Sequence, residues 1–377
     1  MSAIEVRRAS DAVKTPALVA EWEHLAKAHD HVNALFSSPT WVAHLAATTD
    51  TPLHVISIRS ASGELIGIVP FRIRGYTLRF AVAARTLFRR KMAAAEILGS
   101  VPLLPEDPAY YGSVMTQILS EPFNCCAIYL DSVPCDGMLW KYLHDDQFLP
   151  RNCFWHMIED PRPWHLVELA PTFDQYLQSM SAKARANIRR EIRQFSQLAN
   201  GDARTVRVTD STQVKWFLEC AAAISHRSWQ HRVIGERVSC SDAAIRSFED
   251  LAARGILRSY VLQAGEIPYA FAVGYQYSGL YHYVEIGFDE RYSKVSPGKV
   301  LLSLILEDLH GYNRPRILNF GTGDGAYKRR FGNMERSDVS CLIMRKSFQN
   351  IILTRSHSSF NRGIRLANKM IGRHIGK

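Results

Sequence analysis

Hydrophobic and polar positions follow the same pattern in two separate regions of the chain. In residues 54–75 and again in residues 260–279, two apolar runs flank a Gly-Glu pair, and a further strand-like run comes next. Runs rich in β-branched and aromatic residues around a glycine predict antiparallel hairpins. Because hairpins with glycine turns are common, the repeat is as consistent with coincidence as with duplication of one domain.

The second region continues with a pattern that the first does not show. A strand is predicted at 280–289, a Ser-Pro-Gly turn follows, and an apolar helix at about 298–309 precedes a strand at 316–320. Such a parallel unit binds ligands at the carboxyl end of its first strand and at the helix N-terminus. In the first region, the cations of 89–91 and an alanine run stand in place of such an opening. We therefore expect any phosphate-bearing ligand in the second region.

The chain is long enough for two lobes. Its 377 residues exceed one ordinary core, and 47% hydrophobic against 22% charged residues is typical of a globular protein. Three prolines between 161 and 171 interrupt the pattern, and a helical segment follows. These features predict an N-terminal lobe at 1–165, a C-terminal lobe at 172–346 and a basic tail at 347–377.

The charge balance narrows the class of partner. The formal net charge is +10, and six of these charges fall in residues 347–377, which contain no acid, leaving about +4 for the rest. This excess suits an anionic cofactor or a membrane surface and is too small to indicate nucleic acid by itself. The seven cysteines lack metal-ligand spacing, and the N-terminus lacks a secretory signal, so we expect a cytoplasmic protein without a metal or a membrane span.

The loop at 291–300 has the features of a pyrophosphate cradle. Gly298 permits close approach of the backbone, a helix start offers free amides, and Arg and Lys residues flank the turn. The other interpretation is an ordinary helix start, with Ser296 as the cap and Pro297 in the first turn. The sequence leaves both open.

A second loop, at 319–331, is the densest concentration of candidate chemistry. Three glycines within five residues follow a predicted strand and precede a Lys-Arg-Arg run. Asp324 could supply a general base and Lys328 a charge stabiliser beside one reacting atom. The alternative is a glycine-rich turn with solvated cations. Dinucleotide binding is disfavoured, because the third glycine of that fingerprint and a clear helix are both missing.

Several short motifs, taken in order and spacing, carry a resemblance to a known family. They are Phe36 to Trp41, Ile68-Val-Pro70, the basic helix 181–190, Arg227-Ser-Trp229, Gly265-Glu266, Phe288-Asp289, Ser296-Pro297-Gly298, and Gly323-Asp324 followed by Tyr327-Lys328. The chain resembles GNAT-type acyltransferases, specifically the branch associated with cellulose and exopolysaccharide biosynthesis (CelD/BcsL-like), and more distantly the Fem-type aminoacyl transferases. The resemblance is strongest over 172–345.

This resemblance implies an α/β (α+β) fold of tandem GNAT-like lobes. Each lobe would be a mostly antiparallel twisted sheet flanked by helices, with a parallel strand–helix–strand unit in the second. The donor would be acetyl-CoA or another acyl-CoA, with its pantetheine between strands 280–288 and 316–320. The loop departs from the usual family pattern in the position of its glycine. The expected cofactor-binding residues are Lys294, Ser296, Gly298, Lys299, Val300 and Tyr327.

The chemistry that the resemblance implies is direct acyl transfer, without a covalent enzyme intermediate. A base takes a proton from the acceptor, which attacks the thioester, and a donor or cation stabilises the oxyanion. Asp324, Glu285 and His282 are the candidate bases. In a regular strand Glu285 and His282 would point to opposite faces, so only one could reach the substrate. We favour Asp324 and Glu285, with Lys328 stabilising negative charge.

The acceptor site is expected near Arg227, Trp229 and His282, although a tryptophan in an apolar helix is more often part of a core. Arg185, Arg189 and Arg193 form one row on a predicted helix, which is either a solvated face or a place for an anion.

The tail from 360 to 377 has apolar residues on one helical arc and cations on the other. Such a helix either docks on its own lobe or lies on anionic lipid at the inner face of the membrane.

The leading function is an N- or O-acyltransferase acting on a sugar, polysaccharide precursor or small molecule. The alternatives are an aminoacyl-tRNA-dependent Fem-like transferase and a catalytically silent scaffold for polysaccharide secretion. A Fem-type arm would need a long heptad insertion in the second lobe, and none is visible.

Overall fold

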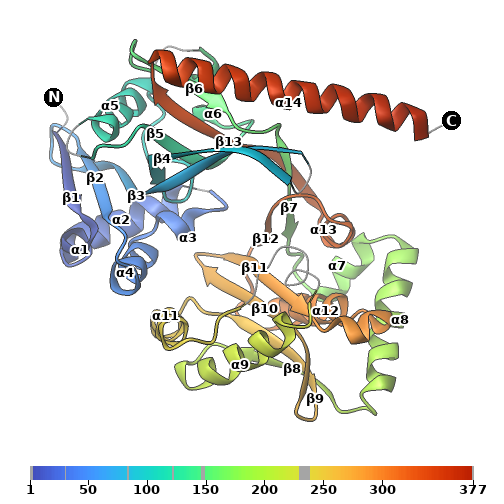
Figure 1. Cartoon of the computed structure of the whole chain (residues 1–377). Helices are drawn as coiled ribbons and strands as arrows, with labels where there is room; N and C mark the ends of the chain where they lie inside the picture. The colour runs from blue at the N-terminus through green and yellow to red at the C-terminus, as the bar shows by residue number, and fades with distance from the viewer. Residues whose placement is uncertain are drawn as a thin grey trace. The chain divides into compact units, whose positions relative to one another are not determined.

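The computed structural model describes residues 3–29, 31–82, 85–120, 123–145, 149–228 and 238–375. The chain divides into two compact units (Figure 1). Unit 1 comprises Met1–Pro163 together with Arg336–Lys377, and unit 2 comprises Trp164–Glu335. The segment after 335 therefore belongs with the N-terminal part of the chain, a different division from the boundary that the sequence predicts near 346.

Unit 2 is a sheet covered by helices on both faces. Its strands are β7 (Arg162–Glu168), β8 (Ala203–Val208), β9 (Ser259–Ala264), β10 (Ile267–Tyr277), β11 (Leu280–Phe288) and β12 (Ile317–Thr322). Its helices are α7 (Phe173–Ser179), α8 (Ala182–Leu198), η1 (Ser211–Gln213), α9 (Val214–Ser225), α11 (Asp242–Ala253), η2 (Glu290–Val295), α12 (Pro297–Gly311) and α13 (Ala326–Phe331).

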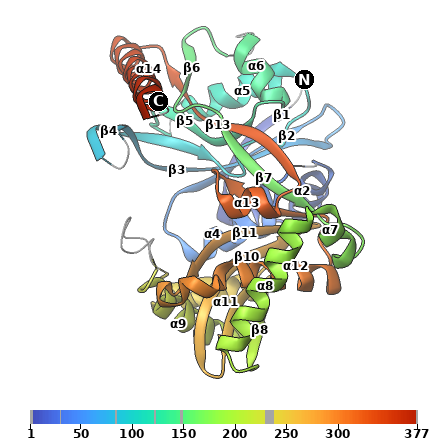
Figure 2. The ribbon, with the colours of Figure 1, turned by 90° about the vertical axis from the view of Figure 1, so that its right-hand side faces the viewer.

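The strand order of unit 2 is β7-β12-β11-β10-β9-β8, and only the β11–β12 pair is parallel. Helices α8 and α12 pack together over one face (Figure 2), while α9 contacts β9, β10 and β11. Ile188 and Phe195 of α8 are buried in this core, as the apolar stripe of that helix predicts. The predicted parallel strand–helix–strand unit is confirmed.

Unit 1 has a sheet of the same general kind. Its strands are β1 (Ala3–Arg8), β2 (Leu53–Arg59), β3 (Leu65–Val82), β4 (Arg85–Ile97), β5 (Ala127–Pro134), β6 (Cys153–Met157) and β13 (Met334–Arg345). Its helices are α1 (Ala9–Ala12), α2 (Pro16–Ala28), α3 (Ala34–Ser37), α4 (Pro39–Thr48), α5 (Pro108–Leu119), α6 (Met138–Asp145) and α14 (Phe348–Ile375).

The strand order of unit 1 is β1-β2-β3-β4-β5-β13, with β6 also pairing with β13. β4 and β5 are parallel and α5 lies between them in the chain, so unit 1 has its own parallel strand–helix–strand unit, which the sequence did not predict. The cations and alanines at 89–95 form strand β4 itself, paired along nearly its whole length with β3. Both units thus follow the order of three antiparallel strands, a helix and a parallel strand. The predicted fold class is confirmed.

The C-terminal segment forms one long helix that begins well before 360. Leu353 and Phe360 of α14 pack with Leu78 and Phe80 of β3, so part of the predicted apolar arc is docked on its own unit (Figure 1). Among the described residues, no helix is both long and apolar enough to cross a membrane.

Candidate functional site

The site is built where β11 and β12 part. Their parallel pairing covers three positions and ends at His282 and Asn319. From that point β11 runs on to Phe288 beside β10, and β12 runs on to Thr322 beside β7. Neither strand pairs with the other there, although each keeps its outer neighbour. The carboxyl halves of two parallel strands thus separate, as the expected binding position requires.

A β-bulge in β11 changes which side chains share a face. Tyr283 lies opposite Gly274 and Glu285 lies opposite Val273, so Val284 is the extra residue. The alternation shifts by one residue beyond the bulge, which places Glu285 on the same face as His282. The expectation that these two side chains point to opposite faces was wrong, because it assumed a regular strand.

The two side chains differ in exposure. His282 is 2% exposed, and burial lowers its pKa to about 3, so its imidazole is neutral at pH 7. Glu285 is exposed on the part of β11 that has parted from β12. Burial raises the pKa of the neighbouring Tyr275, and the charge of Glu285 adds to this rise. Of the two, Glu285 has the accessible carboxyl group that a general base requires.

Aromatic rings cross the gap between the parted strands on the other face. The ring of Tyr283 on β11 meets that of Phe320 on β12 edge-on, with centroids 5.7 Å apart. Phe320 in turn meets Tyr327 of α13 at 5.8 Å. Burial raises the pKa of Tyr327 to about 12, so its phenol stays protonated. These rings form an apolar floor beside which a flexible thioester arm could lie.

The N-terminus of α12 lies at the carboxyl end of β11. A Cβ added to Gly298 would stand 3.3 Å from the ring of Phe288, the last residue of that strand. Close packing against Phe288 therefore explains part of the need for glycine here, beside any approach of a ligand. The same contact fixes the helix start against the opening strands.

The first turn of α12 is less open than the sequence suggests. The amides of Lys299 and Val300 both donate to the carbonyl of Ser296, at 3.0 and 3.1 Å. Ser296 has a left-handed backbone (φ 51°), and its hydroxyl caps no amide. Among the described residues, the amide of Gly298 is the one in this turn without an acceptor, since Pro297 has no N–H. Ser296 is the N-cap residue and Pro297 lies in the first turn, as the second interpretation expects, but the Ser296 side chain makes no capping hydrogen bond. The Gly298 amide is therefore the backbone donor that this turn leaves for an anion.

Cations surround this helix start. Lys294 on η2 is exposed, and Lys299 has a side chain 45% exposed, with its Nζ 3.7 Å from Glu191 of α8. Glu191 is itself buried and accepts a hydrogen bond from Arg330 at 3.0 Å. The positive end of the helix dipole and these lysines favour an anion at the same place.

Arg227 has a different contact from the expected one. Its guanidinium lies 3.4 Å from the carboxylate of Asp289, which is fully buried and which Arg291 binds through two nitrogens. Burial alone would raise the pKa of Asp289, but the hydrogen bonds from Arg291 and Arg227 outweigh it and lower the pKa. Arg227 thereby anchors the turn that leads into η2 and α12. Trp229, expected beside it, lies outside the described residues.

The glycine loop after β12 brings Asp324 against His165 of β7. His165 Nε2 lies 3.2 Å from Asp324 and its Nδ1 lies 3.4 Å from Glu335, while Arg329 also binds Asp324. Partial burial would raise the pKa of Asp324, but the hydrogen bond to His165 and the charge of Arg329 lower it. A carboxylate with a lowered pKa and two bound partners is a weaker proton acceptor. The arrangement suits Asp324 to orient its neighbours.

Lys328 closes the same loop. Its ammonium donates to the carbonyls of Gly321 at 3.3 Å and Thr322 at 2.7 Å, and the residue is only 9% exposed. Gly321 and Gly323 both have positive φ, which explains two of the three glycines. These hydrogen bonds hold the amino group of Lys328 at the end of the parted strand β12.

Two more buried contacts shape this end of β12. Trp164 donates to the side-chain carbonyl of Asn319 at 2.6 Å, and the same oxygen accepts the amide of Gly321 at 2.8 Å. Sequence reasoning missed Trp164, His165 and Asn319, because each contacts a residue far away along the chain. Trp164 and Asn319, for example, are 155 residues apart. Within the described ranges, no cluster of three or more metal-ligating side chains occurs.

Known proteins with a similar fold, and a domain family with a similar sequence, were found for this chain. Residues 182–329 match the acetyltransferase (GNAT) domain family, and no curated protein sequence matches the chain. The fold is similar to FemX (TM-score 0.61, 11% identity, 89% of this chain and 98% of that one). It is also similar to the C-terminal domain of a putative lysylphosphatidylglycerol synthetase from Agrobacterium fabrum (0.52, 13%, 90% and 95%) and to a tandem GNAT protein from the clavulanic acid biosynthesis pathway (0.51, 11%, 92% and 98%). The chain therefore has a tandem GNAT-like fold, and within unit 2 residues 182–329 match the acetyltransferase (GNAT) domain family.

Proposed function

We propose that this protein transfers an acyl group from acyl-CoA to an amine or hydroxyl group of a sugar, a polysaccharide precursor or another small molecule. The observation that supports it most strongly is the parting of β11 and β12 beyond His282 and Asn319, with a cationic helix start at the carboxyl end of β11. Parted parallel strands leave room for the pantetheine arm, and the helix start provides positive charge for the pyrophosphate.

The residues around this opening fit acyl-CoA in three places. The Gly298 amide, Lys294, Lys299 and the Ser296 hydroxyl would hold the pyrophosphate, while the rings of Tyr283 and Tyr327 would border the arm. Glu285 would accept the proton of the acceptor, directly or through one water. Lys328 would stabilise the negative charge that develops on the thioester oxygen, with Asp324 and His165 orienting the loop that carries it.

The finer assignments rest on the sequence resemblance. They include the exopolysaccharide-associated branch of the family, the identity of the acceptor and a cytoplasmic location. All seven cysteines are free, which suits a reducing compartment. The fold similarity to FemX keeps aminoacyl transfer as a second candidate, for which unit 2 would bind charged tRNA in place of acyl-CoA.

Calorimetric titration with acetyl-CoA, CoA and S-acetylpantetheine tests the proposal. We expect acetyl-CoA and CoA to bind with similar affinity, and acetylpantetheine to bind at least about 100-fold more weakly, because it lacks the pyrophosphate. Release of free thiol in the presence of a panel of amines and amino sugars then measures transfer. If none of the three compounds binds, the proposal is contradicted and a silent scaffold is favoured. If charged tRNA binds and none of the three compounds does, the second candidate is favoured.

A further inference from the structure

The surface of unit 1 formed by the β3–β4 hairpin and helix α14 concentrates exposed apolar side chains. Twelve large hydrophobic residues are exposed in the part of the chain that the structure describes, and half of them lie on these two elements. They are Val82 (43%), Leu87 (66%), Phe88 (54%), Phe348 (80%), Ile352 (48%) and Leu366 (54%). A cluster of this kind costs free energy in water and usually marks an interaction surface.

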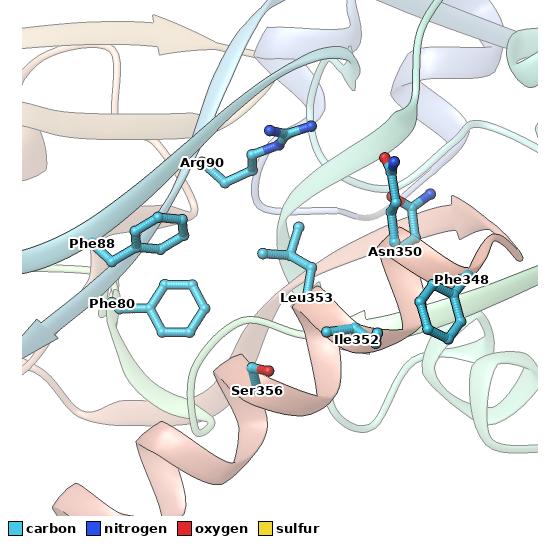
Figure 3. Close-up of a pocket in the computed structure, with 9 residues that line it drawn as sticks. Phe80, Phe88, Arg90, Phe348, Asn350, Ile352, Leu353 and Ser356 are labelled. Atoms are coloured by element: carbon cyan, nitrogen blue, oxygen red, sulfur yellow. The ribbon is translucent and has the colours of Figure 1, made fainter.

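Three of these residues, Phe88, Phe348 and Ile352, line a cavity of about 610 Å³ between the hairpin and the first turns of α14 (Figure 3). Phe80 and Phe88 are directly paired across the hairpin and line one side, with Arg90 beyond them. Ile352 and Leu353 of α14 line the other side. The walls are mainly aromatic and aliphatic, and a cation lies at the edge.

The charged side chains of residues 77–92 and of α14 are all cations, although Asp160, in the turn between β6 and β7, pairs with Arg365 of α14. From Thr77 to Met92 the hairpin carries five cations and no acid, and α14 carries no acid at all. The hairpin cations are Arg79, Arg85, Arg89, Arg90 and Lys91, and none forms an ion pair with a carboxylate in the described ranges. Arg79 lies directly opposite Arg89 in the hairpin register, an arrangement that destabilises an isolated sheet.

We propose that this surface docks on a bilayer that contains anionic phospholipids. Exposed aliphatic and aromatic side chains beside unpaired arginines match the two layers of a membrane interface, the acyl boundary and the negatively charged headgroups. Leu87 is the extra residue of a register shift at the hairpin end, so it projects without a cross-strand partner. Leu87 and Val82 enter the acyl boundary, Arg85 and Arg89 bind lipid phosphates, and an acyl chain fits the cavity between Phe88 and Ile352.

Co-sedimentation of the full chain with vesicles tests this inference, using phosphatidylcholine alone and an equimolar mixture with phosphatidylglycerol. We expect at least tenfold stronger binding to the mixed vesicles, and weaker binding as salt is raised. Val82→Ser combined with Leu87→Ser should weaken binding about tenfold. Arg89→Glu should also weaken it about tenfold, and this change cannot act by unfolding the hairpin, because the new carboxylate faces Arg79.

The matched control carries Ile267→Ser and Arg246→Glu, two exposed positions of unit 2. This variant should bind the mixed vesicles like the unchanged chain. Equal binding to neutral vesicles, unchanged binding of the hairpin variants, or no binding to either vesicle would each overturn the inference. None of these outcomes depends on acyl-CoA, so the inference and the proposed function stand or fall separately.

Discussion

The two units share a strand order but differ at the point where a ligand would bind. In unit 1, β4 pairs with β5 at 94–96, and only one residue of β4 follows. In unit 2, the equivalent pairing comes at the start of β11, and six residues run on after it. The same topology therefore yields a closed pair in unit 1 and an open pair in unit 2, because the place where pairing stops decides whether a gap exists.

The helix that connects the two parallel strands also differs between the units, at its N-terminus. Helix α5 begins with Asp107, whose carboxylate accepts the amide of Ala109 at 2.8 Å, and exposed Glu106 precedes it. That acid stabilises the helix and excludes a phosphate from its N-terminus. Helix α12 also begins with a proline, Pro297, but its N-cap residue Ser296 makes no side-chain capping hydrogen bond, and Gly298 stands in place of Ala109. The comparison shows that shared topology does not give both units the same binding capacity.

The largest expected effect concerns a buried neutral histidine in each unit. Burial lowers the pKa of His282 in unit 2 to about 3, and burial and the nearby His357 lower that of His156 in unit 1 to about 4. The unfolded chain takes up these protons near pH 6.5, so stability is full above that pH and falls as pH drops towards the folded pKa values. The full losses are about 5 kcal/mol for His282 and about 3 kcal/mol for His156.

Urea denaturation between pH 7 and pH 4.5 measures this loss. His282→Gln and His156→Gln should each flatten the pH dependence of the unfolding free energy, since glutamine does not titrate. An unchanged slope in either variant would mean that the histidine of that unit is already protonated, or accessible, in the folded protein.

The next effect concerns the cation of the glycine loop. Lys328→Met should lower kcat for acyl transfer about 300-fold with little change in KM, because the charge acts on the oxyanion that exists only in the transition state. Arg329→Met, at the exposed neighbouring position, should lower kcat far less. Steady-state kinetics decide it, and equal losses in the two variants would assign Lys328 to closing the loop alone.

A smaller effect separates charge from shape at the helix start. Gly298→Asp should weaken binding of acetyl-CoA about 100-fold by repelling the pyrophosphate, while the acid stabilises the helix itself. Gly298→Ala adds the same Cβ beside Phe288 without the charge and should cost several-fold at most. Ala109→Asp makes the matched change in α5 of unit 1 and should leave affinity unchanged. Titration calorimetry that finds similar losses for Gly298→Asp and Gly298→Ala would remove the pyrophosphate assignment.

The smallest effect comes from the exposed lysine of the same turn. Lys299→Ala should weaken acetyl-CoA about threefold, because Glu191 already offsets part of its charge and solvent screens the rest. Raising the salt concentration should reduce the difference between this variant and the unchanged chain. A salt-independent loss would indicate that Lys299 acts by packing.

Local patterns in the sequence were enough to predict the central strands of unit 2 and helix α12. The hairpin at 260–279, the strand at 280–289 and the helix after Ser-Pro-Gly all follow from periodicity and turn residues, which act over short distances. Strand β4 was missed because its Arg-Arg-Lys run lacks the alternation of apolar and polar residues that a half-buried strand shows. The first half of β4, which contains this run, is exposed.

The site was harder to predict than the fold. The bulge at Val284 depends on how β11 aligns with β10, and the left-handed Ser296 depends on the fit of α12 against Phe288, so neither follows from the residue types alone. The pairing of His165 with Asp324 joins positions 159 residues apart, which only the folded sheet brings together. Side-chain identities thus indicated the loops that matter, while the contacts between loops needed the structure.

Hydrogen exchange of the backbone amides, with and without acetyl-CoA, tests the central claim most directly. We expect acetyl-CoA to slow exchange at the start of α12, from Gly298 to Val300, and along Tyr283–Phe288 of β11, while the start of α5 in unit 1 exchanges at an unchanged rate. Protection at the start of α5, or none at the start of α12 under saturating acetyl-CoA, would contradict the assignment of donor binding to unit 2.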